Sequence, residues 1–275
     1  MKKINLIGSG RVGSTLARLW CEQGSFQIQD VLTRSLVTAA HAVSFIGAGH
    51  AVNALADMRD ADLWMLAVPD REISKVAIAL SQVPPQRAPS TVFHCSGALS
   101  SSELLDLSQQ GWSVASAHCL LSFANPRDAL QQFSGTPCAL QGDDRAVELL
   151  SAAFQEIGAC CFPVLEKNKI LYHAAAVFAT NFLPVLQAAA DQLWHDSGMP
   201  QDIAKKIRGT LLHNAVANIL SRGHAGALTG PAARGDVELV LRQAEAVTAW
   251  DPPTGEAYRA LSRLAATLAA NQTQT

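Results

Sequence analysis

The sequence predicts an α/β protein: a doubly wound parallel sheet followed by an all-helical second domain. Three observations predict it. A short apolar strand at the start of the chain breaks into a glycine-rich turn, strands and helices then alternate for about 160 residues, and strand patterns cease after that. We therefore expect two domains, residues 1–166 and residues 167–275.

The glycine-rich turn follows the first strand, residues 2–7, and leads into a helix over residues 12–23. Gly8 allows a tight turn, Gly10 lets the backbone approach a pyrophosphate, and Gly13 lets the helix pack closely on the strand. The phosphates would lie at the helix N-terminus, where free N–H groups favour negative charge. This G-x-G-x-x-G context predicts dinucleotide binding by Gly8, Ser9, Gly10, Arg11, Val12 and Gly13.

The second strand, residues 26–32, ends beside the position where NAD-binding chains usually carry an acid against the ribose 2′-hydroxyl. Thr33, Arg34 and Ser35 stand there instead, and Asp30 comes too early, inside the strand. Arg34 can pair with a 2′-phosphate while the two hydroxyls donate to it. The sequence thus favours NADP over NAD, with a solvated loop cation as the alternative role for Arg34.

The alternation of strands and helices continues beyond this turn. We expect helices over 35–47, 69–82, 100–108 and 144–157, strands over 62–68, 91–94, 112–117, 137–140 and 159–164, and a turn-rich connection over 84–89. Ligands of such sheets bind beyond the carboxyl ends of the strands. This places Val68 and Pro69 at the cofactor, His94 and Ser96 near the nicotinamide, and His118 toward a substrate.

From Lys167 onward the chain shows only helical periodicity, over 168–194, 200–221, 237–249 and 254–270. Lys169, His173 and Asn181 fall within one broad face of the first of these helices, and Pro184 should kink it just past that face. Several of the helices are apolar over more than one stripe. Such faces need burial beyond a single domain contact, so we expect a homodimer.

Composition excludes some classes of partner. The 275 residues are 49% hydrophobic, enough for a large core, and a net charge of −2 gives no reason to expect nucleic acid or an anionic membrane. The apolar stretch 174–190 is interrupted by polar residues and predicts a buried helix, not a membrane span. Six cysteines without C-x-x-C spacing, in a chain with no apolar signal region, predict reduced thiols and a cytoplasmic protein.

Several motifs together resemble one family, the Rossmann-like proteins with C-terminal domain of unknown function 2520. They are 8–13 (GSGRVG), 67–70 (AVPD), 94–98 (HCSGA), 116–118 (SAH), 169–175 (KILYHAA), 181–182 (NF) and 228–236 (LTGPAARGD). The family resembles, more distantly, the 6-phosphogluconate dehydrogenase, ketopantoate reductase and pyrroline-5-carboxylate reductase group. The resemblance implies an NADP-dependent reductase or dehydrogenase whose helical domain supports a homodimer. Cys119, where the family usually has Pro, and residues 120–123, which lack its usual glutamine, depart from the pattern.

Hydride chemistry needs a side chain that supplies or removes a proton. Lys169 and His173 stand one helical turn apart, and a partly desolvated Lys near another cation has a lowered pKa. We expect Lys169, His173 and His118 to be catalytic, and Asn181, Ser96 and His94 to bind substrate. The alternative is that Lys169 is a surface cation and His173 a hydrogen-bonded core residue.

The two His-Cys pairs, at positions 94–95 and 118–119, could suggest zinc. Neighbouring residues of a strand point to opposite faces, so we expect no metal. Two functions remain. The first is an NADP-dependent oxidoreductase acting on a small keto or imino compound, and the second is a non-catalytic NADP(H)-binding sensor or scaffold.

Overall fold

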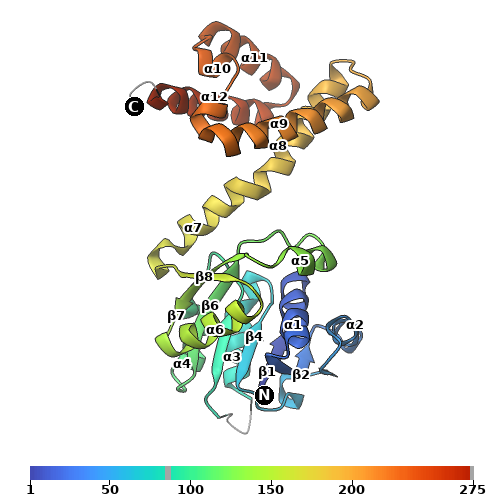
Figure 1. Cartoon of the computed structure of the whole chain (residues 1–275), viewed down its shortest axis with the longest axis vertical. Coiled ribbons are helices and arrows are strands. Elements are labelled where there is room, and N and C mark those ends of the chain that lie inside the picture. The colour runs from blue at the N-terminus through green and yellow to red at the C-terminus, as the bar shows by residue number, and fades with distance from the viewer. Residues whose placement is uncertain (84–87, 273–275) are drawn as a thin grey trace. The chain divides into compact units, whose positions relative to one another are not determined.

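The computed structural model describes residues 1–83 and 88–272. Residues 84–87, part of the turn-rich connection expected over 84–89, lie outside the described residues. The chain forms two compact units, Met1–Thr180 and Asn181–Thr275. The first contains the sheet and the second is helical (Figure 1).

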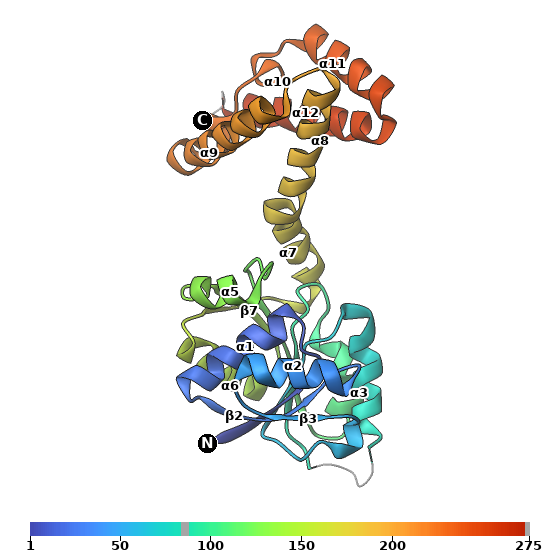
Figure 2. The same ribbon diagram turned by 90° about the vertical axis from the view of Figure 1, so that its right-hand side faces the viewer.

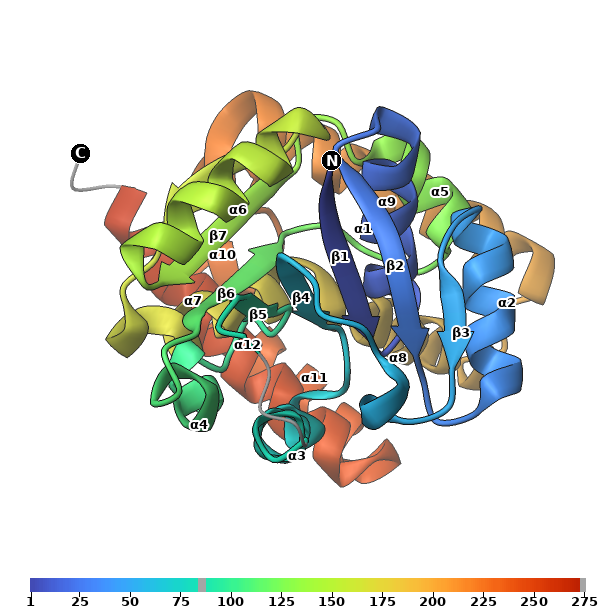
Figure 3. The same ribbon diagram turned by 90° about the horizontal axis from the view of Figure 1, so that it is seen from below.

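The first unit is built on one eight-stranded sheet with the order β3-β2-β1-β4-β5-β6-β7-β8. The order reverses between β1 and β4, which is the doubly wound arrangement that the sequence predicts. The strands are β1 (Lys2–Ile7), β2 (Phe26–Leu32), β3 (His50–Val52), β4 (Leu63–Leu66), β5 (Thr91–His94), β6 (Ser113–Cys119), β7 (Pro137–Gly142) and β8 (Cys160–Pro163). Figure 3 shows β3, β2, β1 and β4 side by side.

The sheet is mostly, not wholly, parallel. Strand β7 runs antiparallel to β6, with Cys119 opposite Cys138, and every other neighbouring pair is parallel. The connection between β6 and β7 carries a short helix, α5 (Pro126–Gln132), that the sequence analysis missed. An antiparallel neighbour needs no crossover to the other end of the sheet, so this short helix suffices. Strand β3 was also missed, because three residues are too few for a period to show.

Helices cover both faces of the sheet. The buried side chains of α1 (Arg11–Gln23), α2 (Leu36–Ile46) and α6 (Asp144–Glu156) join one cluster with the strands, and those of α3 (Ile73–Ser81) and α4 (Leu105–Ser108) join another. Trp20 lies at the centre of the first cluster. Its ring meets the ring of Phe154 edge-on, with the ring centroids 5.2 Å apart, and its Nε1 donates to the carbonyl of Ala153 at 2.8 Å. In the second cluster, Trp64 meets Trp112 at 5.8 Å.

The first long helix is interrupted. A 3₁₀ turn (Glu166–Asn168) leads into α7 (Lys169–Ala176), a π-helical turn (Val177–Asn181) follows, and α8 (Phe182–Asp196) completes the run. Pro184 has no N–H to donate to the carbonyl four residues earlier, at Thr180. The irregular turn lies across that position, as expected of a helix whose hydrogen-bond ladder is broken.

The expectation that residues 174–190 form a buried helix is wrong in one respect. The segment is helical, but none of the most apolar window of Glu166–Asp196 is buried. With a mean hydropathy of 1.3 over that window, the run is long and apolar enough to cross a membrane by length and composition, a test that helices of soluble proteins also pass. Apolar composition shows that a face is suited to burial, but it does not identify what covers that face.

The second unit contains α9 (Gln201–Ala227), α10 (Pro231–Arg234), α11 (Val237–Trp250) and α12 (Pro252–Gln272) together with α8 (Figure 2). Helix α9 continues past its predicted end but bends at Gly223, whose φ of 71° lies in the left-handed region. Nε1 of Trp250 donates to the carboxylate of Asp196 at 2.6 Å, which ties α11 to the end of α8.

Candidate functional site

The glycine turn has the geometry of a dinucleotide loop. Gly8 has a φ of 85°, and a Cβ there would lie 2.5 Å from the carbonyl oxygen of Ala67. At Gly13 a Cβ would lie 2.7 Å from Cβ of Ala67, so α1 can approach β4 only without a side chain. At Gly10 a Cβ would meet nothing within 4 Å. Two of the glycines are therefore required by packing, and the third faces open space at the N-terminus of α1.

A cavity of about 400 Å³ opens at this turn, beyond the carboxyl ends of β1, β4 and β5. The N-terminus of α1 lines this cavity. No side chain caps the helix at Gly10 and no acid occupies its first turn, so its first backbone N–H groups are free to bind an anion. The lining residues are Gly10, Arg11, Val12, Gly13, Ala67, Val68, Pro69, Asp70, Cys95, Ser96 and Phe123. Phe123 belongs to the segment that departs from the family pattern, and it forms part of the wall.

Ser96 joins the cavity to a buried lysine. Its hydroxyl donates to Oδ2 of Asp70 at 2.8 Å and accepts from the backbone N–H groups of Ala98 and Leu99. Its carbonyl accepts from Nζ of Lys169 at 3.3 Å. The loop after β5 is thus held on one side by a carboxylate and on the other by an ammonium group.

Lys169 is not the surface cation of the alternative interpretation. Only 1% of it is exposed, and Nζ also donates to Oγ of Ser116 at 2.9 Å. Burial lowers the pKa of Lys169 to about 8, although the negative charge of Asp70 opposes the shift. A lysine with that pKa exchanges its proton near neutral pH, as an acid or base in catalysis must.

His118, Tyr172 and His173 form a cluster next to this lysine. Nδ1 of His118 lies 2.9 Å from Oη of Tyr172, and the rings of His118 and His173 meet edge-on at 5.4 Å. Burial, helped by His173 and Lys169, lowers the pKa of His118 to about 4. Burial also raises the pKa of Tyr172. His118 is therefore a neutral imidazole at physiological pH, and Tyr172 is a neutral phenol.

His94 does not take the place expected for a substrate contact. It is completely buried, Nε2 bonds to the carbonyl of Ser100 at 2.9 Å, and Nδ1 accepts from the N–H of Ser96 at 3.2 Å. Burial lowers its pKa to about 4. Both ring nitrogens are occupied by the backbone, so His94 supports the Ser96 loop and has no nitrogen free for a substrate.

The expected 2′-phosphate contacts lie at the end of β2. Ser35 caps α2 by accepting from the N–H of Thr38 at 3.2 Å, Thr33 donates to the carbonyl of Ser35 at 2.9 Å, and Arg34 is exposed. Asp30 is 1% exposed and paired with Arg59 at 2.6 Å. This carboxylate is paired inside the sheet, so the end of β2 presents the exposed Arg34 beside two hydroxyls that bond within the turn.

Asn181 begins the second unit, at the end of the π-helical turn. It is exposed on the helical run that carries Lys169 and His173. Its expected contact with a substrate remains a prediction.

The expected absence of a metal also remains a prediction. Sγ of Cys119 lies 3.6 Å from Sγ of Cys138. Burial raises the pKa of Cys95 to about 12, so the thiol of Cys95 stays protonated. Within residues 1–83 and 88–272, no three His, Cys, Asp or Glu side chains gather as a metal site.

Three residues of the site were not assigned a role from the sequence: Asp70, Ser116 and Tyr172. Asp70 and Ser116 occur in motifs at or near the ends of predicted strands, which was an available signal. Tyr172 also lies in a motif, 169–175, but that motif does not pair it with His118, because His118 lies on another element and only the fold brings the two together.

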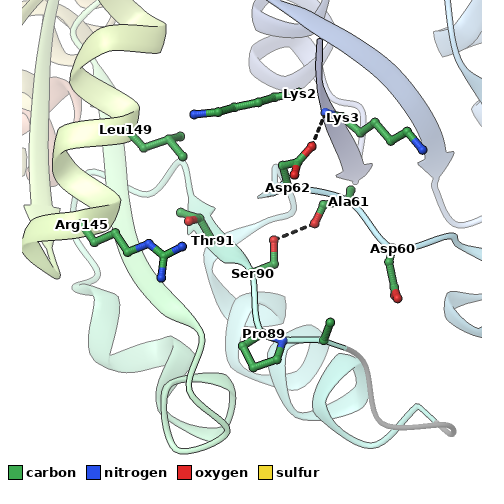
Figure 4. Close-up of a pocket in the computed structure, with 11 residues that line it drawn as sticks. Lys2, Lys3, Asp60, Ala61, Asp62, Pro89, Ser90, Thr91, Arg145 and Leu149 are labelled. Carbon is green, nitrogen blue, oxygen red and sulfur yellow. Dashed lines mark hydrogen bonds between the residues drawn. The ribbon is translucent and has the colours of Figure 1, made fainter.

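A larger cavity, of about 530 Å³, lies at the opposite ends of the strands (Figure 4). The side chains of Lys2 and Arg145 reach into it, while Asp62 accepts from the backbone N–H of Lys3 at 2.7 Å. Ligands of doubly wound sheets bind at the carboxyl ends of the strands, and this cavity lies at the amino ends. We therefore take the smaller cavity as the candidate site.

Two protein families match successive parts of the chain, and the second match begins within the first compact unit. Residues 1–118 match the Rossmann-like domain, and residues 136–265 match the domain of unknown function DUF2520. The chain thus carries a Rossmann-like N-terminal domain and a DUF2520 C-terminal domain. Among proteins of curated function, none matches.

Solved structures share the whole fold. Protein TM1727 from Thermotoga maritima is 26% identical with a TM-score of 0.73, covering 98% of this chain and 99% of its own. The candidate NADP oxidoreductase BF3122 from Bacteroides fragilis is 20% identical with a TM-score of 0.76, covering 97% and 98%. A pyrroline-5-carboxylate reductase from Coxiella burnetii is 16% identical with a TM-score of 0.59, covering 99% and 97%. Two of these three neighbours are thus described by name as an oxidoreductase and a reductase.

Proposed function

We propose that this chain is an NADP(H)-dependent oxidoreductase that transfers a hydride between NADP(H) and a small keto or imino compound. One observation carries the proposal: Ser96 lines the cavity at the glycine turn, and its carbonyl accepts a hydrogen bond from the buried Lys169. The pocket suited to a dinucleotide and the group suited to proton transfer therefore meet at one residue.

The residues present fit the cofactor. Its pyrophosphate would lie against Gly10, where the backbone faces open space at a helix N-terminus. Arg34, Thr33 and Ser35 would hold a 2′-phosphate, which favours NADP over NAD. Val68, Pro69 and Ser96 would surround the nicotinamide, the part of the cofactor that supplies or accepts the hydride when bound.

Lys169 would donate or accept the proton, depending on the direction of the reaction. In the direction of reduction, an N–H bond of its ammonium group breaks and an O–H or N–H bond forms on the substrate atom beside the carbon that receives the hydride. The pKa of about 8 leaves much of the lysine protonated at neutral pH and makes the transfer facile. His173 is the second candidate for this role, and Asn181 would orient the substrate atom.

The names of similar structures support a carbonyl or imine as the reacting group. Besides the pyrroline-5-carboxylate reductases, a reductive aminase from Aspergillus terreus in complex with NADPH and ethyl-5-oxohexanoate is 15% identical with a TM-score of 0.62. At these identities the likeness shows the fold alone, so the reacting group is part of the proposal. A second copy of the chain would cover the exposed apolar helices, and the six free thiols suit a reducing, cytoplasmic compartment.

Oxidation of NADPH in the presence of keto acids, ketones and cyclic imines tests the proposal. The wild-type protein should bind NADPH and consume it with members of one of these classes. Lys169→Met should keep NADPH binding and lose turnover by roughly 10²-fold or more. Lys167→Met is the matched control, because Lys167 is exposed on the same run. A protein that binds NADPH but consumes none with any compound would instead be a sensor or scaffold.

A further inference from the structure

Two imidazole nitrogens converge on the backbone of Gly97. A Cβ at this position would lie 2.4 Å from Nδ1 of His173 and 2.8 Å from Nε2 of His118. Both contacts are shorter than real Cβ atoms tolerate, so glycine is required for the two rings to lie where they do. Gly97 directly follows Ser96, which lines the cofactor cavity.

Neither of these two nitrogens has a hydrogen-bond partner among the described residues. Nδ1 of His173 is buried and has no hydrogen-bond partner among the residues that the structure describes. Within the same residues, His118 makes its hydrogen bond through Nδ1, to Tyr172, and none through Nε2. Buried polar nitrogens without a partner are costly unless something bonds to them.

The hydrogen bond to Tyr172 decides which nitrogen of His118 carries the proton. A neutral imidazole has one N–H, and the other nitrogen is an acceptor. In the described parts of the chain, Oη of Tyr172 has no partner other than His118. If the phenol donates its hydrogen to a protein atom, the acceptor is therefore Nδ1 of His118. The proton of His118 then lies on Nε2, on the side of Gly97.

The alternative tautomer is less favourable. If Nδ1 donated to Tyr172, the phenolic hydrogen would lack an acceptor among the described residues. The charged forms are also disfavoured, since burial lowers the pKa of His118 to about 4 and raises that of Tyr172. His173, Lys169 and Asp70 are the other charged or titratable groups that act on His118.

We propose that Tyr172 is a positioning residue that donates to Nδ1 of His118 and so presents Nε2–H as a donor to an acceptor oxygen of the substrate, next to Gly97. The proposal rests on the function proposed above and deepens it. It makes the substrate a compound with an oxygen acceptor separate from the group that Lys169 protonates. It also gives His118 a binding role as a neutral donor, in place of acid–base catalysis.

Nitrogen NMR of histidine-labelled protein, with and without saturating NADP⁺, tests the tautomer directly. The signals of His118 are identified by their loss in His118→Asn. In the wild type, His118 should be the Nε2–H tautomer, and Tyr172→Phe, which removes one oxygen and keeps the ring, should change it toward a mixture. The control is Tyr258→Phe, because the other tyrosine of the chain donates to Gln243 in the second unit and should not affect His118.

Oxamate, a small compound with carboxylate and carbonyl oxygens, is the probe for the donor role. It should shift the Nε2–H signal of His118 in the wild type and have a weaker effect in Tyr172→Phe. An Nδ1–H tautomer in the wild type overturns the proposal even if Tyr172→Phe does not fold. An unchanged tautomer in that variant, or an absence of any oxamate effect on the wild type, also overturns it. Failure of the wild type to bind NADPH would contradict the proposed function but leave the tautomer result standing.

Discussion

Nζ of Lys169, on α7, donates to Oγ of Ser116, on β6, at 2.9 Å, and Ser116 precedes His118 by two positions on that strand. Side chains two positions apart on a strand point to the same face. Ser116 also donates to Oε1 of Gln141 on β7 at 3.2 Å, which fixes its hydroxyl. The sheet therefore presents to α7 one polar face that holds the lysine and the imidazole together.

The first prediction concerns the pH dependence of activity. Lys169 must be protonated to donate in the direction of reduction, and its pKa is about 8. We expect kcat/KM for reduction to fall as the pH rises through about 8, because the fraction of ammonium declines. The residual kcat/KM of Lys169→Met should not fall over this pH range, whereas that of Lys167→Met should fall as in the wild type. A wild-type profile flat between about pH 7 and 9 would exclude Lys169 as the donor.

The second prediction separates two glycines of the same turn. Gly8→Ala should lower the free energy of unfolding by more than about 1 kcal/mol, because φ is 85° and the new methyl group meets a carbonyl oxygen. Gly10→Ala should leave the free energy of unfolding nearly unchanged, since its Cβ meets nothing within 4 Å. It should nevertheless weaken NADPH binding, because the methyl group occupies the approach to the pyrophosphate. Urea denaturation and NADPH titration measure the two effects. Equal NADPH affinity in Gly10→Ala and the wild type would refute the placement of the phosphates.

The third prediction concerns the choice of cofactor. Arg34→Ala should weaken the binding of NADPH by about 1 to 3 kcal/mol and the binding of NADH far less, since only NADPH has the 2′-phosphate. Arg145→Ala, an exposed arginine at the amino ends of the strands, is the control and should change neither affinity. Calorimetric titration measures both cofactors. An equal loss for NADPH and NADH would remove Arg34 from the site.

The fourth prediction concerns stability in acid. His94 is completely buried with a pKa of about 4, against about 6.5 in the unfolded chain. Between these values the unfolded chain binds more protons than the native one, so stability falls as the pH is lowered from about 6.5 to 4. Full burial of His94 accounts for about 2 kcal/mol of loss between about pH 7.5 and 5. Urea denaturation should show a smaller loss in His94→Asn, and an equal loss in both proteins would contradict the assignment.

The fifth prediction is that the protein is a homodimer assembled through its helical part. Leu220 is 83% exposed and Val185 is 62% exposed, and each lies among other exposed apolar side chains of α8 and α9. Exposed apolar area of this kind is typical of an interface. Light scattering at micromolar concentration should give the mass of two chains, and Leu220→Glu with Val185→Glu should give one. A monomeric wild type would contradict this prediction.

Local patterns determined the first half of the protein. The glycine turn, the strand-helix alternation and the ends of the strands are short-range features, and chain connectivity then places the loops after β1, β4 and β5 on one side of the sheet. The sequence also indicated Lys169 and His173 as a pair, because a helix brings residues four apart onto one face. It did not reveal the direction of β7, since antiparallel and parallel neighbours show similar apolar runs.

Only the tertiary structure decided what each polar side chain does. His94 and His118 both end predicted strands and looked equivalent, yet the backbone of the Ser96 loop occupies both nitrogens of His94 and leaves Nε2 of His118 free. The burial of Lys169 and the bond between Tyr172 and His118 depend on α7 packing against β6. The physical reason is that periodicity reports which face a residue occupies, whereas pKa and hydrogen bonding depend on atoms brought together from distant parts of the chain.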